Sequence, residues 1–200
     1  MRVLKISVVF GLIITVLLSM ARFDALCLDL RENVLRLHIR AASDLDYDQN
    51  LKLKVRDAIL SEYGNDFQNC NNKAEAVKFA QENLENFKNL AKDTILSNGF
   101  DYEVYVNVGE SYFENREYDT FTLPAGMYES INVIIDEGKG KNWWCVMFPA
   151  VCIGASSSLD KAVNSDSANV AENSSDFKIR FKTVEIYEDL KNFFKNRKNK

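Results

Sequence analysis

Two side chains of this 200-residue sequence, Cys145 and His38, are of the types that form a thiolate–imidazole pair. A cysteine hydrolase needs such a pair within hydrogen-bond reach, and Asn142 would be available to orient the imidazole ring. However, Cys145 lies in the apolar run Trp143–Phe148, and apolar surroundings raise the pKa of a thiol and disfavour the reactive thiolate. We therefore predict that the chain has no catalytic residue and is not an enzyme. A secreted cysteine hydrolase that uses Cys145 and His38 is the alternative.

An acidic run, Asp44, Asp46 and Asp48, resembles the start of a calcium-binding loop. Such a loop needs glycine at its sixth position and a bidentate glutamate at its twelfth. Gln49 and Val55 occupy these two positions. Helix capping explains the acidic residues better, so we predict no metal ion, no cofactor and no small-molecule substrate.

The apolar run belongs to a longer stretch, Leu123–Cys152, which contains both tryptophans, both prolines and two of the four cysteines. A strand is predicted from Tyr128 to Asp136, followed by a basic loop that contains two glycines. A soluble domain buries a run such as Trp143–Phe148 or presents it to a partner. Binding is therefore the expected activity. The predicted partner-binding residues are Trp143, Trp144, Lys141, Lys139 and Phe148.

The run Gly140–Pro149, together with Pro124–Gly126 and Tyr128-Glu129, resembles the signature of the stage II sporulation protein R family. The upstream stretch from Arg36 to Asp57 resembles the amino-terminal block of the same family, with Ala42 where the family pattern has asparagine. The resemblance extends over residues 34–152 and fades in the C-terminal tail.

This resemblance implies a signalling protein of endospore-forming bacteria. Such a protein is exported from the forespore into the space between the forespore and mother-cell membranes. There it activates, by direct contact, the membrane-embedded aspartic protease that processes pro-sigma-E. The implied partner is therefore this protease. We predict that the globular α+β signalling domain extends over residues 22–154.

The amino terminus has the pattern of an export signal. Arg2 and Lys5 precede the uncharged run Ile6–Ala21, and Ser19 and Ala21 place small residues at a candidate cleavage site. We predict a signal peptide at residues 1–21, with an uncleaved membrane anchor as the alternative, although an anchor usually has about 20 apolar residues. Removal of residues 1–21 lowers the formal net charge from −4 to −6. Such an acidic chain is a poor candidate for binding nucleic acid.

Export would place the cysteines in a compartment that permits disulfides, where four cysteines allow three pairings. Cys145 and Cys152 are the expected pair, because Pro149 between them favours a chain reversal. Two buried free thiols are the alternative. A zinc site is disfavoured, because six residues separate the two cysteines and His38 is distant in the sequence.

We predict an α+β fold, with an antiparallel or mixed sheet of about four to five strands and two helices packed on one face. A leader helix precedes it and a flexible C-terminal tail follows. The alternation of apolar and polar residues predicts strands at Val34–Arg40, Tyr102–Val108, Tyr112–Leu123 and Tyr128–Asp136. Capping patterns and apolar periodicity predict one helix from Asp46 to Gly64 and another from Asn72 to Asn98.

The C-terminal part of the sequence changes in character. Residues 155–176 are rich in serine and asparagine and are predicted to be a flexible linker. Residues 177–200 are predicted to form a short strand, Phe177–Thr183, and a short helix, Val184–Phe194, followed by a basic tail. The last ten residues carry five positive charges, and a solvated basic tail is the favoured interpretation. Contact with an anionic membrane through the leader or this tail is the alternative.

Overall fold

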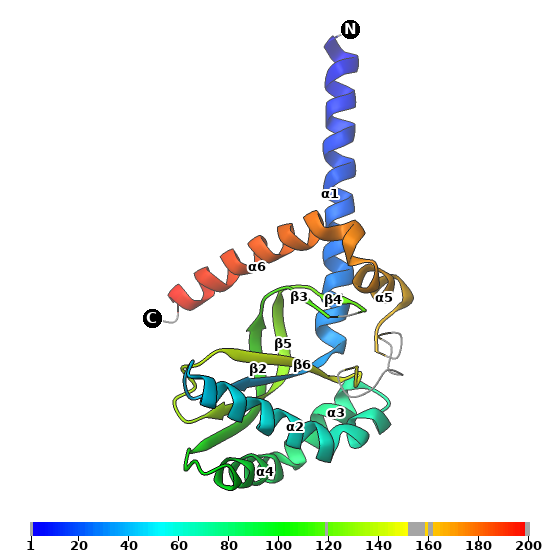
Figure 1. Ribbon diagram of the computed structural model, residues 1–200. Coiled ribbons are helices and arrows are strands. Elements are labelled where there is room, and N and C mark those ends of the chain that lie inside the picture. The colour runs from blue at the N-terminus through cyan, green and yellow to red at the C-terminus, as the bar shows by residue number, and fades with distance from the viewer. Residues whose placement is uncertain (1, 119, 152–158, 160–161, 199–200) are drawn as a thin grey trace. The chain divides into compact units, whose positions relative to one another are not determined.

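The computed structural model describes residues 2–118, 120–151, 159 and 162–198 (Figure 1). Its residues form two compact units. The smaller unit consists of residues 1–32, 112–126 and 164–200, and the larger one consists of residues 33–111 and 127–163. The predicted domain at residues 22–154 therefore contributes to both units.

The larger unit contains a mixed four-stranded sheet in the order β2-β5-β1-β6 (Figure 1). Strand β1 (Leu35–Arg40) runs parallel to β5 (Gly126–Ile135) and antiparallel to β6 (Asn142–Phe148), and β2 (Val104–Phe113) lies at the far edge. The predicted α+β class is confirmed. Strand β1 lies inside the sheet because its residues pair on both sides.

Helices α2 (Asp46–Asn69), α3 (Lys73–Glu82) and α4 (Leu84–Ser97) cover one face of this sheet (Figure 1). Fully buried side chains from the helices and strands form the core between them: Leu37, Ile39, Val55, Ile59, Phe67, Phe87, Ile95, Ile131 and Val133. Burial of large apolar side chains contributes about 1.5–3 kcal/mol each to folding. This layer therefore holds the sheet from one side. On the opposite face Arg36, Ser130 and Val146 are also buried, whereas other side chains are accessible.

Two helix boundaries differ from the prediction. Helix α2 continues past Gly64 to Asn69. The single helix predicted from Asn72 to Asn98 is interrupted at Asn83, which ends α3 and begins α4. The side-chain amide of Asn83 donates a hydrogen bond to the Phe79 carbonyl, 2.9 Å away. An asparagine side chain competes in this way with the helical backbone bonds, so it marks the interruption.

The smaller unit contains α1 (Arg2–Asn33), of which residues 2–32 belong to it, and the short paired strands β3 (Arg116–Glu117) and β4 (Thr122–Leu123). Helix α5 (Ser165–Glu172), the 3-10 helix η2 (Ser174–Phe177) and α6 (Lys178–Lys198) complete it. Its apolar core comprises Phe23, Cys27, Val170, Phe181 and Val184. Helix α1 is long and apolar enough to cross a membrane, which fits either a signal peptide or an anchor.

Several predictions for this unit were wrong. The strand predicted over Phe177–Thr183 is helical, because the buried residues Phe181, Val184 and Glu188 recur every three or four positions. The strand predicted over Tyr112–Leu123 is reduced to the end of β2 and the two-residue strands β3 and β4. Part of the predicted linker, Ser165–Glu172, forms α5.

Candidate partner-binding site

The two neighbouring tryptophans of β6 project from opposite faces of the sheet. Trp143 lies opposite the fully buried Ile39, and Trp144 lies opposite His38. Trp143 packs against the helix-covered core, and the guanidinium carbon of Arg56 lies 4.3 Å from the centre of its ring. The rings of Trp144 and His38 have their centres 6.3 Å apart. The two tryptophans therefore do not form one apolar patch.

Two further sequence-predicted residues lie in the core. Phe148 is 3% exposed and packs in the helix-covered core, so it has no free surface for an interface. Cys145 lies opposite Leu37 and is also in this core, whereas His38 projects from the other face of β1. The pair Cys145 and His38 considered for hydrolase chemistry is therefore not brought together, because adjacent strand positions face opposite ways.

The side chains that project away from α2–α4 and are at least partly accessible form what we call the outer sheet face. The registers of β1 with β5 and β6 and the alternation along β2 define its members. They are Tyr105, Asn107, Ser111, His38, Arg40, Asn132, Ile134, Asn142 and Trp144. Tyr105 is 60% exposed, and Trp144, His38 and Arg40 are half-buried. Tyrosine, tryptophan and arginine are the residue types that contribute most often to binding energy at protein interfaces.

A hydrogen-bond network joins the polar members of the outer sheet face. His38 Nε2 lies 2.9 Å from Asn142 Oδ1, and His38 Nδ1 lies 3.2 Å from Asn132 Oδ1. The Asn132 amide donates to Asn107 Oδ1 at 3.0 Å, and the Ser111 hydroxyl donates to Asn132 Oδ1 at 2.7 Å. The network links all four strands and holds these side chains in place before any partner arrives, which lowers the entropic cost of binding.

The basic loop before β6 is held by backbone hydrogen bonds. The Gly140 amide donates to the Ala41 carbonyl at 2.9 Å, and the Lys141 amide donates to Asp44 Oδ1 at 2.7 Å. The Lys52 ammonium donates to the Lys141 carbonyl at 3.0 Å. Asp44 therefore anchors this loop. The loop sets where β6 begins and where Asn142 meets His38.

The two lysines predicted to bind a partner are exposed at the start of β6. Lys139 forms an ion pair with Glu137, whose hydrogen bond and charge raise the pKa of Lys139. The side chain of Lys141 is exposed, while its backbone is bonded to Asp44 and Lys52. Both lysines therefore border the outer sheet face and add positive charge next to it.

Burial in the network lowers the pKa of His38 below its usual 6.5; hydrogen bonds with Asn142 and Asn132 oppose this shift, and the charges of Arg40 and Arg36 add to it. The unfolded chain therefore takes up a proton at a higher pH than the folded protein. The contribution of His38 to stability is fully present above about pH 6.5 and is lost as the pH falls below that value.

We accordingly expect the free energy of unfolding, measured with urea, to fall between about pH 7.5 and about pH 5. In His38→Gln this fall should be smaller, because the titrating group is gone. Carboxylates elsewhere contribute equally to both proteins and cancel in the comparison. If the free energy of unfolding had the same pH dependence in both proteins, the lowered pKa of His38 would be contradicted.

Comparisons with known proteins cover the strands of the outer sheet face. The family model described as stage II sporulation protein R matches residues 31–158. The curated stage II sporulation protein R of Bacillus subtilis (strain 168) is 35% identical over 121 residues, which are 60% of this chain and 54% of that relative. The matched region is thus about half the length of the relative. No solved structure gives a significant match.

Proposed function

Because the chain belongs to the stage II sporulation protein R family and therefore has a role in sporulation, we propose that it is an exported signal. In this proposal it activates, by direct contact, the membrane-embedded aspartic protease that processes pro-sigma-E. It acts in the space between the forespore and mother-cell membranes. The apolar helix α1, which fits a signal peptide or an anchor, supports export.

The proposed contact surface is the outer sheet face with Lys139 and Lys141 at its border. The observation that carries this choice is that the family match, residues 31–158, includes all four strands that build the face. The exposed Tyr105, the half-buried Trp144 and the hydrogen-bonded His38 also support it. The C-terminal helices α5 and α6 lie beyond the match, so the proposal assigns them no part in the shared activity.

The proposed activator is not a catalyst, so its effect must come from tighter binding to the active arrangement of the protease. Changing a two-state protease from about 1% to about 99% active requires a preference of about 10⁴-fold, or about 5.5 kcal/mol. A single hot-spot side chain contributes about 2 kcal/mol or more. About three such side chains are therefore sufficient, and Trp144, Tyr105 and Arg40 are the candidates.

The test is to co-express this chain, the protease and pro-sigma-E in a non-sporulating host and to measure cleavage of pro-sigma-E by immunoblot. Cleavage is expected only when all three proteins are present. Cleavage without this chain would contradict the signalling role. Cleavage by this chain and pro-sigma-E without the protease would instead favour an enzymatic function.

We also propose that Cys145 forms a disulfide with Cys152, which lies outside the part of the chain that the structure describes. Support comes from Cys27 and Cys70, which are free thiols and leave these two cysteines as the remaining candidates. A disulfide here would fix the end of β6, the strand that carries Trp144.

Protein secreted through an oxidising compartment and then denatured should react with alkylating reagent at two cysteines, and at all four after reduction. Under native conditions Cys70, which is partly exposed, should react first, because Cys27 is fully buried. Mass spectrometry of the alkylated peptides provides the measurement. Alkylation of all four cysteines before reduction would rule out the disulfide.

A further inference from the structure

Helix α6 exposes an apolar stripe, which we define as Ile179, Ile186, Tyr187, Leu190, Phe193 and Phe194. Their exposed fractions lie between 53% and 84%. Most steps between them are of three, four or seven residues, so the side chains follow one face of the helix. Phe181, Val184 and Glu188 lie on the opposite, buried face. A helix that presents apolar residues on a second, exposed face has surface left for another contact.

The charges of α6 are sorted about this stripe. The acidic residues face their own unit: Glu185 accepts a hydrogen bond from the Asn115 amide at 2.9 Å, and Asp189 accepts one from the Tyr112 hydroxyl. The basic residues Lys182 and Lys191 form ion pairs with acidic residues three positions away, yet their side chains remain 66% and 62% exposed. Exposed basic side chains therefore flank the stripe.

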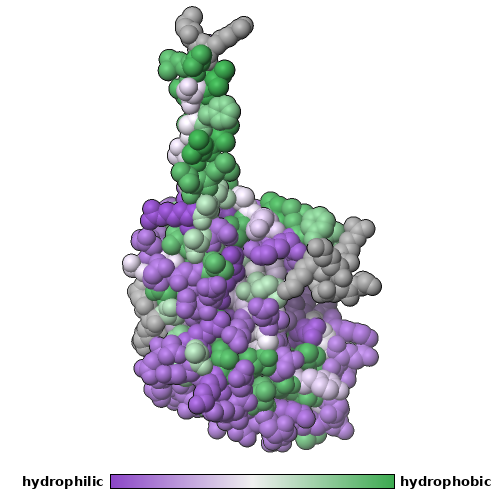
Figure 2. Space-filling model, turned by 180° about the vertical axis from the view of Figure 1, so that it is seen from behind, coloured by the Kyte–Doolittle hydropathy of each residue, from purple (hydrophilic) through white to green (hydrophobic). Residues whose placement is uncertain are grey.

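Helix α6 contacts α1 at the base of the apolar segment of α1 that projects from this unit. Phe23 of α1 packs edge-to-face on Phe181 of α6, with ring centres 5.2 Å apart, so the two helices cross in contact. Figure 1 shows α6 running across α1 just below the projecting apolar segment of α1. In Figure 2 the hydrophobic side chains beside the base of that segment lie on the upper side of this unit.

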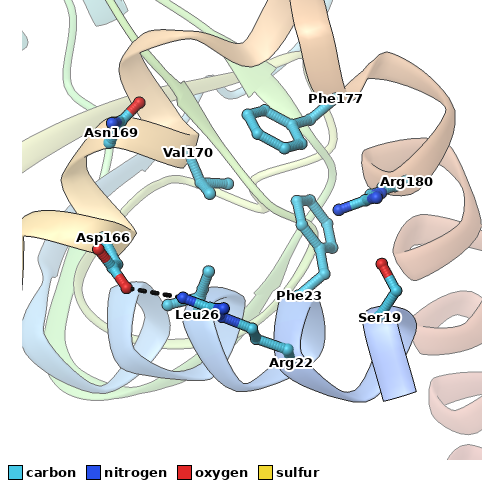
Figure 3. A pocket seen from close by; sticks show the side chains of 9 residues that line it. All are labelled: Ser19, Arg22, Phe23, Leu26, Asp166, Asn169, Val170, Phe177 and Arg180. Atoms are coloured by element: carbon cyan, nitrogen blue, oxygen red, sulfur yellow. Dashed lines mark hydrogen bonds and ion pairs between the residues drawn. The ribbon is translucent and has the colours of Figure 1, made fainter. Parts of the chain in front are cut away.

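A pocket of about 330 Å³ lies where these helices meet (Figure 3). Two guanidinium groups border it, those of Arg22 and Arg180. Arg22 follows the uncharged run of α1 and forms an ion pair with Asp166 at 3.1 Å, with both side chains exposed. The guanidinium carbon of Arg180 lies 5.6 Å from the centre of the Phe177 ring. Positive charge is thus concentrated at the point where the apolar segment of α1 leaves the unit.

We propose that α1 is retained as an uncleaved anchor and that α6 lies in the surface of the anionic membrane that α1 enters, with the apolar stripe of α6 inserted in the interfacial layer. Helices of this kind bury their apolar face about 5–10 Å into the boundary between headgroups and acyl chains, and flanking Lys and Arg attract anionic lipids. Arg22, Arg180, Lys182 and Lys191 would lie at headgroup level. The position of α6 at the base of the membrane-length helix α1 favours a bilayer over a second copy of the chain.

The test uses the full chain carrying Phe193→Trp, reconstituted in vesicles of phosphatidylglycerol and phosphatidylcholine whose acyl chains carry bromine near the headgroup. Phe193 is 58% exposed, so the larger ring is accommodated without repacking. The parent protein gives the emission of Trp143 and Trp144 as the baseline. The added emission should be blue-shifted and largely quenched by bromine, and less so when phosphatidylglycerol is omitted.

A second pair of variants, built in the Phe193→Trp protein, separates insertion from general charge effects. Ile186→Glu with Leu190→Glu should abolish the quenching of the added emission. Asn86→Glu with Asn89→Glu adds the same charge at exposed positions of α4 and should leave the quenching unchanged. Equal quenching in both pairs would overturn the proposal. The proposal would also be overturned if bromine did not quench the added emission. The added tryptophan would then be either accessible to acrylamide in the aqueous phase or shielded by contact with another copy of the chain, which crosslinking would detect.

Discussion

Trp144→Ala is expected to abolish cleavage of pro-sigma-E in the co-expression assay while the protein stays folded. Trp144 projects from the outer sheet face next to His38, where we place the contact with the protease. Loss of a tryptophan at the centre of an interface typically costs about 2 kcal/mol or more, which corresponds to roughly 30-fold weaker binding. Immunoblots for the mature sigma factor, with circular dichroism of the purified variant, provide the measurement.

The matched control is Leu96→Ala. Leu96 is an exposed apolar residue, 48% accessible, of α4 in the same unit, but it belongs to the helix layer rather than to the outer sheet face. Its replacement should leave cleavage unchanged. Normal cleavage with Trp144→Ala, or an equal defect with Leu96→Ala, would remove the outer sheet face as the contact surface.

The second large effect is expected from Gly140→Ala, which should destabilise the larger unit. A methyl group on Gly140 would lie 2.2 Å from the Ser43 carbonyl oxygen and 2.5 Å from its carbon. Both are backbone atoms, so the loop must move and its hydrogen bond to Ala41 must lengthen or break. Overpacking of this kind costs about 1–3 kcal/mol and sometimes more. In a chain of this length each kcal/mol lowers Tm by about 2–4 °C.

Gly109→Ala is the control for this substitution. It makes the same chemical change in β2, where a methyl group would meet only Asn107 Oδ1, 3.9 Å away. Differential scanning calorimetry of the two variants should show a lower Tm for Gly140→Ala alone. If both variants lost the same stability, the close approach of Gly140 to Ser43 would not be the cause.

Local patterns were sufficient to predict much of the larger unit. The alternation of Leu35, Leu37 and Ile39 identified β1, whose three apolar residues are all fully buried. The capping pattern of Asn72 and Glu75 identified the start of α3, where Asn72 Oδ1 accepts the Glu75 amide at 2.9 Å. These signals depend only on neighbours in the sequence. The parallel pairing of β1 with β5 was beyond them, because it joins residues such as Leu37 and Ile131 that are far apart in the chain.

The C-terminal helix shows where short patterns are ambiguous. Phe177, Ile179 and Phe181 alternate as in a strand, but Ile179 is 84% exposed and Phe181 is buried. Val184 and Glu188 complete the buried set at helical spacing. Three apolar residues fit both the strand period of two and the helix period of about 3.6, because the sequence does not say which of them the core covers.

The candidate site could be predicted only in part. The sequence placed the predicted partner-binding residues in β6 and in the loop before it. The period of two along a strand already puts Trp143 and Trp144 on opposite faces. The hydrogen bonds of His38 with Asn132 and Asn142 could not be predicted from the sequence, because they depend on the register of three strands. The polar alternation of Arg36, His38 and Arg40 was the available signal for the outer sheet face.

Photocrosslinking from position 105 tests the central claim most directly. A photoreactive phenylalanine analogue replaces Tyr105, which is 60% exposed on the outer sheet face, and in a second protein it replaces Leu96 of α4. After irradiation of cells that contain the protease, we expect a covalent adduct with the protease from position 105 and none from position 96. An adduct from position 96 without one from position 105 would contradict the account.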